Sequence, residues 1–210
     1  MTIMNTIELL DFITLVFTFL CLISSIIETM KMKKKVKLYK IESLDNLSAE
    51  EYLKNLYYKI NEIYPKTNTR ISIKIIEEKN LEYPENSKVV TRISYPNYPE
   101  TNNTSYTIQK NTDLQSLYIN NKEYFWVSNL KEFNSFNQYS NENQDFLKKW
   151  NTCIVYPIKE KMENNIIGFL TISSQKEFNN VKGNKFLMKY IENITDKLYE
   201  ILLKEDKIQK

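Results

Sequence analysis

Residues 151–174 read NTCIVYPIKEKMENNIIGFLTISS, and this stretch decides the predicted fold. Its first part, residues 153–156, is β-branched and aromatic and ends at Pro157, which indicates a strand. A polar turn follows, and residues 166–172 resume a strand that has Gly168 in its interior. Because both strands are apolar, the hairpin needs cover on at least one face. The stretch therefore predicts a hairpin inside a larger, helix-covered sheet.

Helices are predicted before and after this hairpin. Ser48 and Glu51 have the spacing of a capping box, an apolar face follows them, and Pro65 marks the end of this first helix. The last and longest helix is predicted over residues 181–206. The elements expected between them are strands at 71–75, 89–95 and 124–127, a short helix from a capping-box pattern at 112–115 to 119, a short helix at 144–150, and polar loops at 96–105 and 133–143.

The last helix carries an apolar stripe at spacings of four, three, four and three. The stripe consists of Leu187, Ile191, Ile194, Leu198 and Ile201. Such a stripe is typical of a helix that packs on a core. It also fits a helical dimer seam formed together with the first helix. Both interpretations stay open, because part of the stripe can face the sheet while other rows of the helix face a partner.

The net charge of +3 is unevenly distributed along the chain. Residues 1–27 carry two acids and no base, residues 28–40 carry six lysines against one acid, and the remainder carries 23 bases and 23 acids. The basic surplus therefore forms one cluster ahead of an electrically balanced domain.

The basic cluster follows the most hydrophobic segment. Residues 12–27 carry no charge, and with the apolar residues from Ile7 onward the run approaches twenty residues, near the span of a bilayer. A cleavable signal peptide is one alternative, but the acidic start, the missing cleavage pattern and the lysines that follow argue against it. A buried core helix is the other alternative.

We expect a single-pass membrane anchor. The lysines expected at the inner lipid surface are Lys31, Lys33, Lys34, Lys35 and Lys37, which place the N-terminus outside and the following domain in the cytoplasm. Beside a membrane span, lipid is favoured over nucleic acid as their partner.

Several kinds of chemistry lack their residues in this sequence. There is no histidine, and the two cysteines, Cys21 and Cys153, lie far apart, so no disulfide, zinc or histidine-based site is expected. Two glycines do not make a phosphate-binding loop. Paired acids such as Glu50–Glu51 fit capping or solvated charge, and a strand thiol such as Cys153 is more often an inert apolar residue. We therefore expect no metal, no cofactor and no enzyme.

The order of elements resembles the GAF domain family over roughly residues 46–204. The motifs that carry the resemblance are Tyr124-Phe125-Trp126-Val127-Ser128-Asn129-Leu130, Cys153-Ile154-Val155-Tyr156-Pro157-Ile158 and Ile166-Ile167-Gly168-Phe169-Leu170-Thr171-Ile172, with Phe178 before the last helix. The resemblance implies an α+β fold. In it, the first and last helices pack on one face of a central antiparallel sheet, a small-molecule pocket lies on the other, and dimers form through those helices.

This interpretation divides the chain into three parts. They are an N-terminal transmembrane anchor at 1–30, a basic juxtamembrane connector at 31–45 and a GAF-like domain at 46–210. The signatures of the cyclic-nucleotide-binding, methionine-sulfoxide-reducing and bilin-binding members of the family are missing. Asn184-Lys185-Phe186 begins like the first of these but sits in the last helix.

A ligand pocket is expected between the sheet and the middle segment. The candidate lining residues are Tyr106, Trp126, Phe136, Tyr139, Trp150 and Tyr156, with Asn151 as a polar contact. Aromatic side chains with a few hydrogen-bonding groups suit a planar or cyclic small molecule. The alternative, that these aromatics simply fill the core, stays open.

Two function classes follow. The first is a membrane-tethered cytoplasmic sensor or signalling module, acting as a homodimer and through an effector protein or the membrane helix. The second is a ligand-free, membrane-bound scaffold that recruits or restrains an effector.

Overall fold

The computed structural model describes residues 47–97, 104–136, 138–143, 145–160, 163, 165–205 and 207–208, together with residues 16, 18–19 and 23–25. The chain divides into two units, Met1–Asn46 and Leu47–Lys210. The predicted membrane anchor and the basic cluster belong to the first unit, and apart from the six residues just given they lie outside the described part. No helix among the described residues combines the length and the apolar character that crossing a membrane requires.

The second unit is built on one antiparallel sheet. Its described strands follow the order β3-β2-β1-β6-β5-β4. The strands are β1 (Thr69–Glu78), β2 (Lys88–Tyr95), β3 (Ser105–Thr107), β4 (Phe125–Val127), β5 (Thr152–Lys159) and β6 (Ile166–Ser174). The helices are α2 (Ala49–Ile63), α3 (Thr112–Tyr118), α4 (Leu130–Ser135), α5 (Phe146–Lys149) and α6 (Val181–Lys204), with 3-10 turns η2 (Pro84–Asn86) and η4 (Ile108–Lys110).

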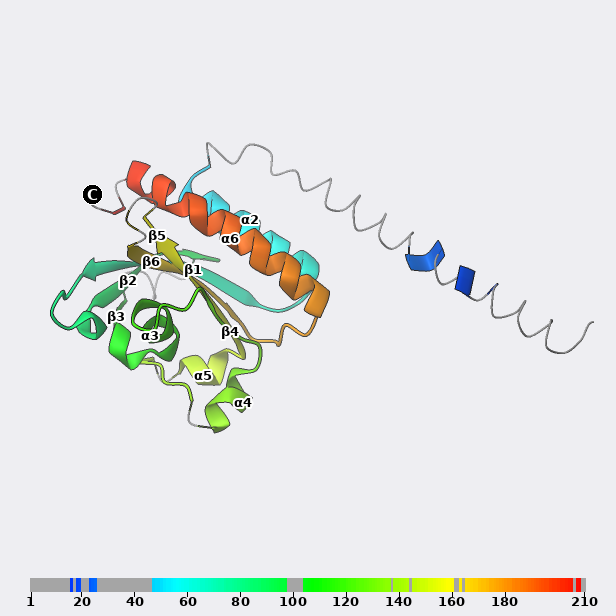
Figure 1. Cartoon of the computed structure of the whole chain (residues 1–210), viewed down its shortest axis with the longest axis horizontal. Coiled ribbons are helices and arrows are strands. Elements are labelled where there is room, and N and C mark those ends of the chain that lie inside the picture. The colour runs from blue at the N-terminus through cyan, green and yellow to red at the C-terminus, as the bar shows by residue number, and fades with distance from the viewer. Residues whose placement is uncertain are drawn as a thin grey trace, which may run out of the picture. The chain divides into compact units, whose positions relative to one another are not determined.

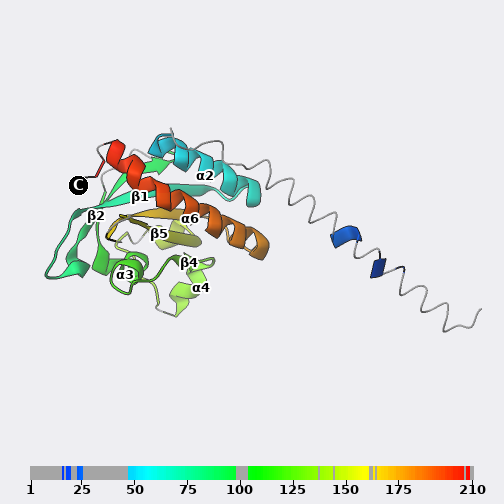
Figure 2. The same ribbon diagram turned by 45° about the horizontal axis from the view of Figure 1, so that its top comes forward.

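Helices cover both faces of this sheet. The first and last helices of the unit, α2 and α6, run side by side over one face, and α3, α4 and α5 lie on the other side (Figures 1 and 2). The predicted α+β arrangement, with first and last helices together on one face, is therefore confirmed.

The predicted hairpin is confirmed as β5 and β6, which pair from Thr152↔Ser174 to Lys159↔Ile166. On its other edge β6 pairs with β1, so the hairpin lies inside the sheet. Gly168 is required there for a local reason: a Cβ at this position would lie 2.4 Å from the backbone oxygen of Lys74. Real side chains do not reach so close to a backbone atom, so the two strands approach each other only because this residue is glycine.

Alternation along the strands separates two apolar layers. On the α2–α6 side, isoleucines of β1 pack with residues of β5 and β6 under the helix stripe; the buried residues of this layer include Ile71, Ile73, Ile154, Leu170, Ile172, Leu187, Ile191, Ile194 and Leu198. The first four residues of the predicted α6 stripe are thus buried against the sheet, and Ile201 is half-buried.

The ends of α2 and α6 are fixed by polar contacts. The capping box at Ser48 and Glu51 is present as predicted. Glu205, after α6, accepts a hydrogen bond from the Ala49 amide at 2.9 Å, which ties the start of α2 to the end of α6. At their other ends, Tyr64 stacks on Phe178 with ring centroids 4.1 Å apart.

Three local predictions differ from the structure. The cap of α3 is Asn111, not Thr112, because Thr112 is already helical and its hydroxyl contacts Ser140 instead. Short helix α4 was not predicted, and its second half falls in the predicted loop at 133–143. The short edge strand β3 begins at the residue where the predicted loop ends, and it is held by its pairing with β2.

Candidate ligand-binding face of the sheet

The sheet face toward α3 carries a group of buried hydroxyl side chains. We call this group the hydroxyl row; it consists of Ser72, Thr91, Ser94, Thr171 and Ser173. Cross-strand pairing brings its members together, because Ser72 is the partner of both Ser94 and Thr171. The opposite face of the same strands carries mainly isoleucine and leucine, with buried hydroxyls at Thr69 and Ser174 near the strand ends. Apolar side chains would therefore also fit the central positions of the sheet.

Hydrogen bonding within the hydroxyl row is incomplete. The Ser72 and Thr171 hydroxyl oxygens lie 2.6 Å apart and satisfy each other. Thr91 is 1% exposed, and its Oγ1 has no hydrogen-bond partner. A buried hydroxyl without a partner costs about 1–3 kcal/mol, and native structures rarely keep one without reason.

A buried polar cluster adjoins the row. We call it the Asp113 cluster; it consists of Asp113, Tyr139 and Cys153. The Tyr139 hydroxyl donates to Asp113 Oδ2 at 3.3 Å, and the Cys153 thiol lies 3.6 Å from the same oxygen. The Leu114 amide donates to Asp113 Oδ1 at 2.9 Å. These donors hold the carboxylate inside the protein, beside the start of β5.

The cluster keeps the Cys153 thiol and the Tyr139 phenol protonated. Burial first, and then the negative charge of Asp113, raises the pKa of the Cys153 thiol well above its ordinary value. The same two causes raise the pKa of the Tyr139 phenol. Because the thiolate is the nucleophilic form, Cys153 is held in its unreactive form in this arrangement.

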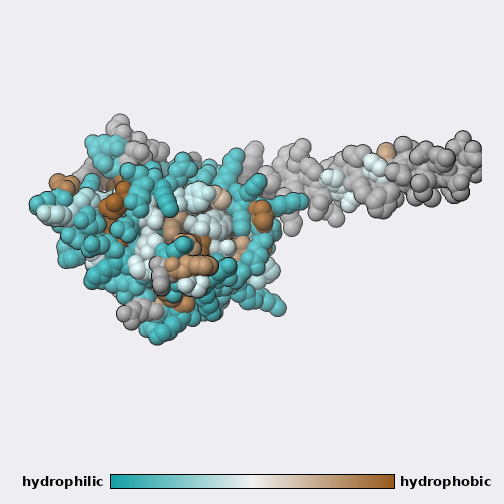
Figure 3. Space-filling model, turned by 60° about the horizontal axis from the view of Figure 1, so that its bottom comes forward, coloured by the Kyte–Doolittle hydropathy of each residue, from teal (hydrophilic) through white to brown (hydrophobic). Residues whose placement is uncertain are grey.

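Apolar side chains close the rest of this face. They form one cluster under α3 to α5, consisting of Val89, Ile108, Leu114, Leu117, Phe125, Leu130, Tyr139, Trp150, Cys153, Val155 and Phe169. The outer surface of this side is largely hydrophilic, with separate small hydrophobic patches (Figure 3).

One cation belongs to the same face. Lys74 pairs across the strands with Thr91 and Phe169, and its Nζ lies 4.2 Å from the centroid of the Tyr106 ring. Lys74 therefore places a positive charge at the edge of the hydroxyl row, under an aromatic side chain of β3.

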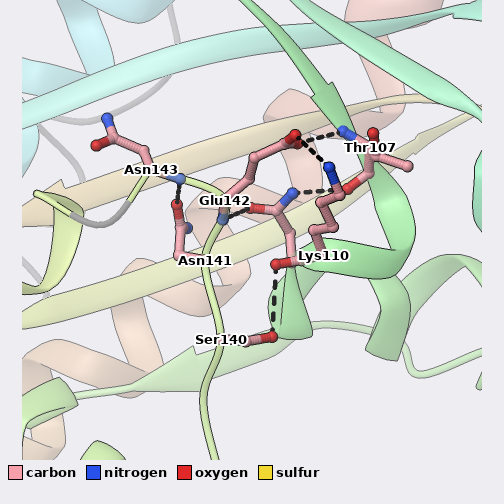
Figure 4. A network of polar contacts seen from close by, with 7 residues as sticks. Thr107, Lys110, Ser140, Asn141, Glu142 and Asn143 are labelled. Carbon is pink, nitrogen blue, oxygen red and sulfur yellow. Dashed lines mark hydrogen bonds and ion pairs between the residues drawn. The ribbon is translucent and has the colours of Figure 1, made fainter.

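The segment that covers the Asp113 cluster is attached to η4 by a network of hydrogen bonds. We call it the loop network; it consists of Thr107, Lys110, Asn111, Ser140 and Glu142 (Figure 4). The Glu142 carboxylate accepts from the Thr107 amide at 2.7 Å and from Lys110 Nζ at 3.1 Å. Asn111 Nδ2 donates to the Thr107 carbonyl at 2.7 Å, and its Oδ1 accepts from the Glu142 amide. This network positions Tyr139 over Cys153.

The structure separates the predicted pocket residues. Tyr106, Tyr139 and Trp150 lie on the α3 side of the sheet. Trp126 and Tyr156 lie on the α2–α6 side, because Trp126 pairs with Ile154 and Tyr156 with Leu170.

The other two predicted residues lie at the margin. Phe136, which caps the end of α4, is 66% exposed. Asn151 directs its Nδ2 to Glu177 Oε1 at 3.3 Å, while its Oδ1 is buried without a partner. Among the described residues, no group of three or more Cys, Asp or Glu side chains is arranged to hold a metal ion.

Sequence reasoning missed the hydroxyl row and Asp113. Ser72 and Lys74 alternate with isoleucines, which is the usual pattern of a strand with one solvated face. The missing signal was the position of β1 inside the sheet: a central strand covered on both faces has no solvated side.

Comparison with known proteins identifies the fold. No family model matches the sequence, and no curated protein does either. Among solved structures, the GAF domain of a two-component sensor histidine kinase from Bacillus halodurans matches with a TM-score of 0.52 at 15% identity, over 76% of this chain and 96% of that one. The GAF domain of an Acinetobacter phosphoenolpyruvate-protein phosphotransferase matches with a TM-score of 0.55 at 12% identity, over 85% and 97%. The chain has a GAF-like fold.

One expectation is corrected by these comparisons. A type II free methionine-R-sulfoxide reductase from Thermoplasma acidophilum also matches, with a TM-score of 0.47 at 14% identity over 72% of this chain and 92% of that one. The expectation that this chain is not an enzyme is wrong as an exclusion, because the GAF fold includes enzymes.

Proposed function

We propose that residues 47–210 form a regulatory GAF-like module that binds a small polar molecule at the hydroxyl row. The observation that carries the proposal is the row itself, five buried hydroxyls in the middle of a sheet, of which Thr91 keeps an unpartnered oxygen. Buried polar groups of this kind are satisfied when a ligand supplies the missing partners. A chain that needed only a stable core would carry valine or alanine there.

The chemistry of the face narrows the ligand. Hydroxyls both donate and accept, Lys74 adds a cation, and Tyr106 adds an aromatic surface. Asp113 already accepts three hydrogen bonds from the protein, so it orients Tyr139 rather than being free for a ligand. The arrangement suits a small molecule with several hydrogen-bonding groups, at least one of which accepts a hydrogen bond or carries negative charge.

The signalling part of the proposal concerns the first unit and the two long helices. We propose that residues 7–27 anchor the chain in a membrane with the domain in the cytoplasm, on the sequence pattern given above. The hydrogen bond from Ala49 to Glu205 connects the start of α2, next to the first unit, with the end of α6. Ligand binding at the site would be transmitted through these helices to a second copy of the chain or to an effector protein. The similar structures from regulatory proteins support this proposal by analogy of fold.

A second candidate is a ligand-free, membrane-bound scaffold. The observation that favours it is the apolar cluster, which fills the α3 side with side chains such as Leu114, Leu117 and Phe169. In this case the hydroxyl row would be part of the packed core and not a binding surface.

Thermal unfolding separates the two candidates. The full chain in neutral detergent is heated with a panel of amino acids, nucleotides, sugars and carboxylic acids. A ligand present at a hundredfold excess over its Kd adds about 2.7 kcal/mol of stability. A midpoint shift by one chemical class supports the binding module; a panel without any shift, together with a crystal structure whose α3 side is solidly packed, leaves the scaffold. Release of the chain from membranes by high salt alone would contradict the anchor.

A further inference from the structure

A groove at the turn end of the β5–β6 hairpin is lined by lysines from three separate segments of the chain. It encloses about 550 Å³ between the end of β1, the end of α3 and the β5–β6 turn. Its charged lining residues are Lys79, Lys122 and Lys159. No member of the hydroxyl row lines it, so it is separate from the site proposed above.

The three lysines are not paired with carboxylates in the part of the chain that the structure describes. Within the described part of the chain, none of their ammonium groups makes an ion pair or a hydrogen bond, and every charged residue that lines the groove is a lysine. Like charges brought together repel one another, and the repulsion is relieved when an anion enters. Glu163 accepts a hydrogen bond from Nδ2 of the lining residue Asn165 at 2.7 Å, and one carboxylate beside three lysines leaves an excess of positive charge.

An adjoining groove also contains cations, but most of them are paired with carboxylates. It shares Lys79, Asn165 and Ile166 with the first groove, and its lining also includes Glu77 and Glu160. Its other cations are paired: Arg92 with Glu77, and Lys207 with Glu205 at 2.7 Å. The unpaired charges are therefore a property of the lysine groove and not of this end of the molecule as a whole.

The remaining lining indicates what the anion carries. Tyr118 is half-buried at the end of α3, and Leu117 and Ile166 add apolar wall. Asn121 and Asn165 supply amide groups. Lysine ammonium groups bind phosphate as point charges, while aromatic and apolar walls contact an organic part.

We infer that the lysine groove is a second binding site, specific for a small molecule or headgroup that carries a phosphate. Lys79, Lys122 and Lys159 neutralise the phosphate, and Tyr118 contacts the group that bears it. The site lies on the same unit as the hydroxyl row but shares none of its residues, so either proposal stands or fails without the other.

The test is calorimetric titration of inorganic pyrophosphate into the full chain in neutral detergent at low ionic strength. We expect one saturable site per chain, weakened at least tenfold in the triple variant Lys79→Gln, Lys122→Gln, Lys159→Gln. The matched control is Lys131→Gln, Lys182→Gln, Lys185→Gln, which removes the same charge from exposed positions on α4 and α6. The control is expected to bind within threefold of the unmodified chain. Equal loss in both variants, or no saturable binding, overturns the proposal.

A second titration distinguishes the two sources of phosphate. Glycerophosphoglycerol, a soluble phosphodiester with the headgroup chemistry of an anionic lipid, is compared with pyrophosphate. Tighter binding of the diester supports a lipid headgroup, and tighter binding of pyrophosphate supports a free phosphate compound. Circular dichroism melting of both triple variants checks that the lysine substitutions leave the fold intact.

Discussion

At the scale of single residues, the two glycines of the chain carry different amounts of constraint. Replacing Gly168 by alanine puts a methyl group 2.4 Å from the Lys74 backbone oxygen, which can move only by separating β1 from β6. Overpacking of this kind costs about 1–3 kcal/mol. We expect Gly168→Ala to lower the free energy of unfolding by that amount in a urea titration.

Gly183→Ala is the matched comparison. Its added methyl group would meet the Ile63 Cγ2 atom at 2.6 Å and the Asn180 side chain, both of which can move. Alanine also favours the helix by up to about 1 kcal/mol. We expect a smaller loss than at Gly168; an equal or larger loss would show that the contact between α2 and α6 is the stricter one.

The Asp113 cluster predicts a dependence of stability on pH. The folded-state pKa of the Cys153 thiol is raised above its ordinary value of 9.0, so the unfolded chain releases this proton first as pH rises. The protonated Cys153 thiol contributes its full stabilisation of the folded state below pH 9. Above pH 9 this contribution falls by about 1.4 kcal/mol per pH unit, as expected for one titrating group. The unfolding free energy should therefore fall from pH 9 to 10 more steeply in a Cys21→Ser chain than in the same chain with Cys153→Ala. Parallel curves would mean that the thiol titrates normally in the fold.

At the scale of elements, the loop network holds the segment that carries Tyr139. Glu142→Ala removes the acceptor of both the Thr107 amide and Lys110 Nζ. Lys110→Ala removes the exposed ion pair alone, which is worth about 0–1 kcal/mol. Hydrogen exchange of the Thr107 amide should quicken roughly tenfold in the first variant, the equivalent of about 1.4 kcal/mol, and little in the second. Similar exchange rates of the Thr107 amide in both variants would mean that contacts other than those of Glu142 keep this segment in place.

The sequence predicted the elements with strong periodicity and missed those set by neighbours. The hairpin at 151–174, α2 with its capping box and the stripe of α6 follow from local spacing, and all three are confirmed. Short β3 and α4 have no such pattern, because β3 depends on its pairing with β2 and α4 on its cap at Asn129.

The sequence predicted the sheet face of some candidate residues correctly and of others wrongly. All the candidate residues were expected on the sheet face opposite the first and last helices, and Tyr106, Tyr139 and Trp150 lie on that face. Trp126 and Tyr156 lie on the other face, because the face a strand residue takes depends on its register with the next strand, and a shift of one residue reverses it. The burial of Asp113 was not expected, because an acidic residue at the start of a helix gives the same sequence pattern whether it caps the helix or is buried.

At the scale of the whole molecule, residues 47–210 form one folded unit that carries two separate polar features, the hydroxyl row and the lysine groove. The row is buried on the α3 side of the sheet, where a bound molecule would be enclosed. The groove is open at one end of the sheet, where a larger or membrane-bound partner could reach it. A GAF-like unit with both would respond to one ligand inside and to a phosphate outside.

The most direct test of the central claim is the unfolding of Thr91→Val with and without a compound that stabilises the unmodified chain. Valine replaces an unpartnered buried hydroxyl by a methyl group, so it should raise the unfolding free energy by about 1 kcal/mol, or the midpoint by about 2–4 °C. The control Thr69→Val removes a buried hydroxyl that is bonded to Thr67 at 2.9 Å, and should lower it. If the hydroxyl row binds the compound, the ligand-induced shift should fall in Thr91→Val and persist in Thr69→Val. A full shift in Thr91→Val would contradict binding at the hydroxyl row.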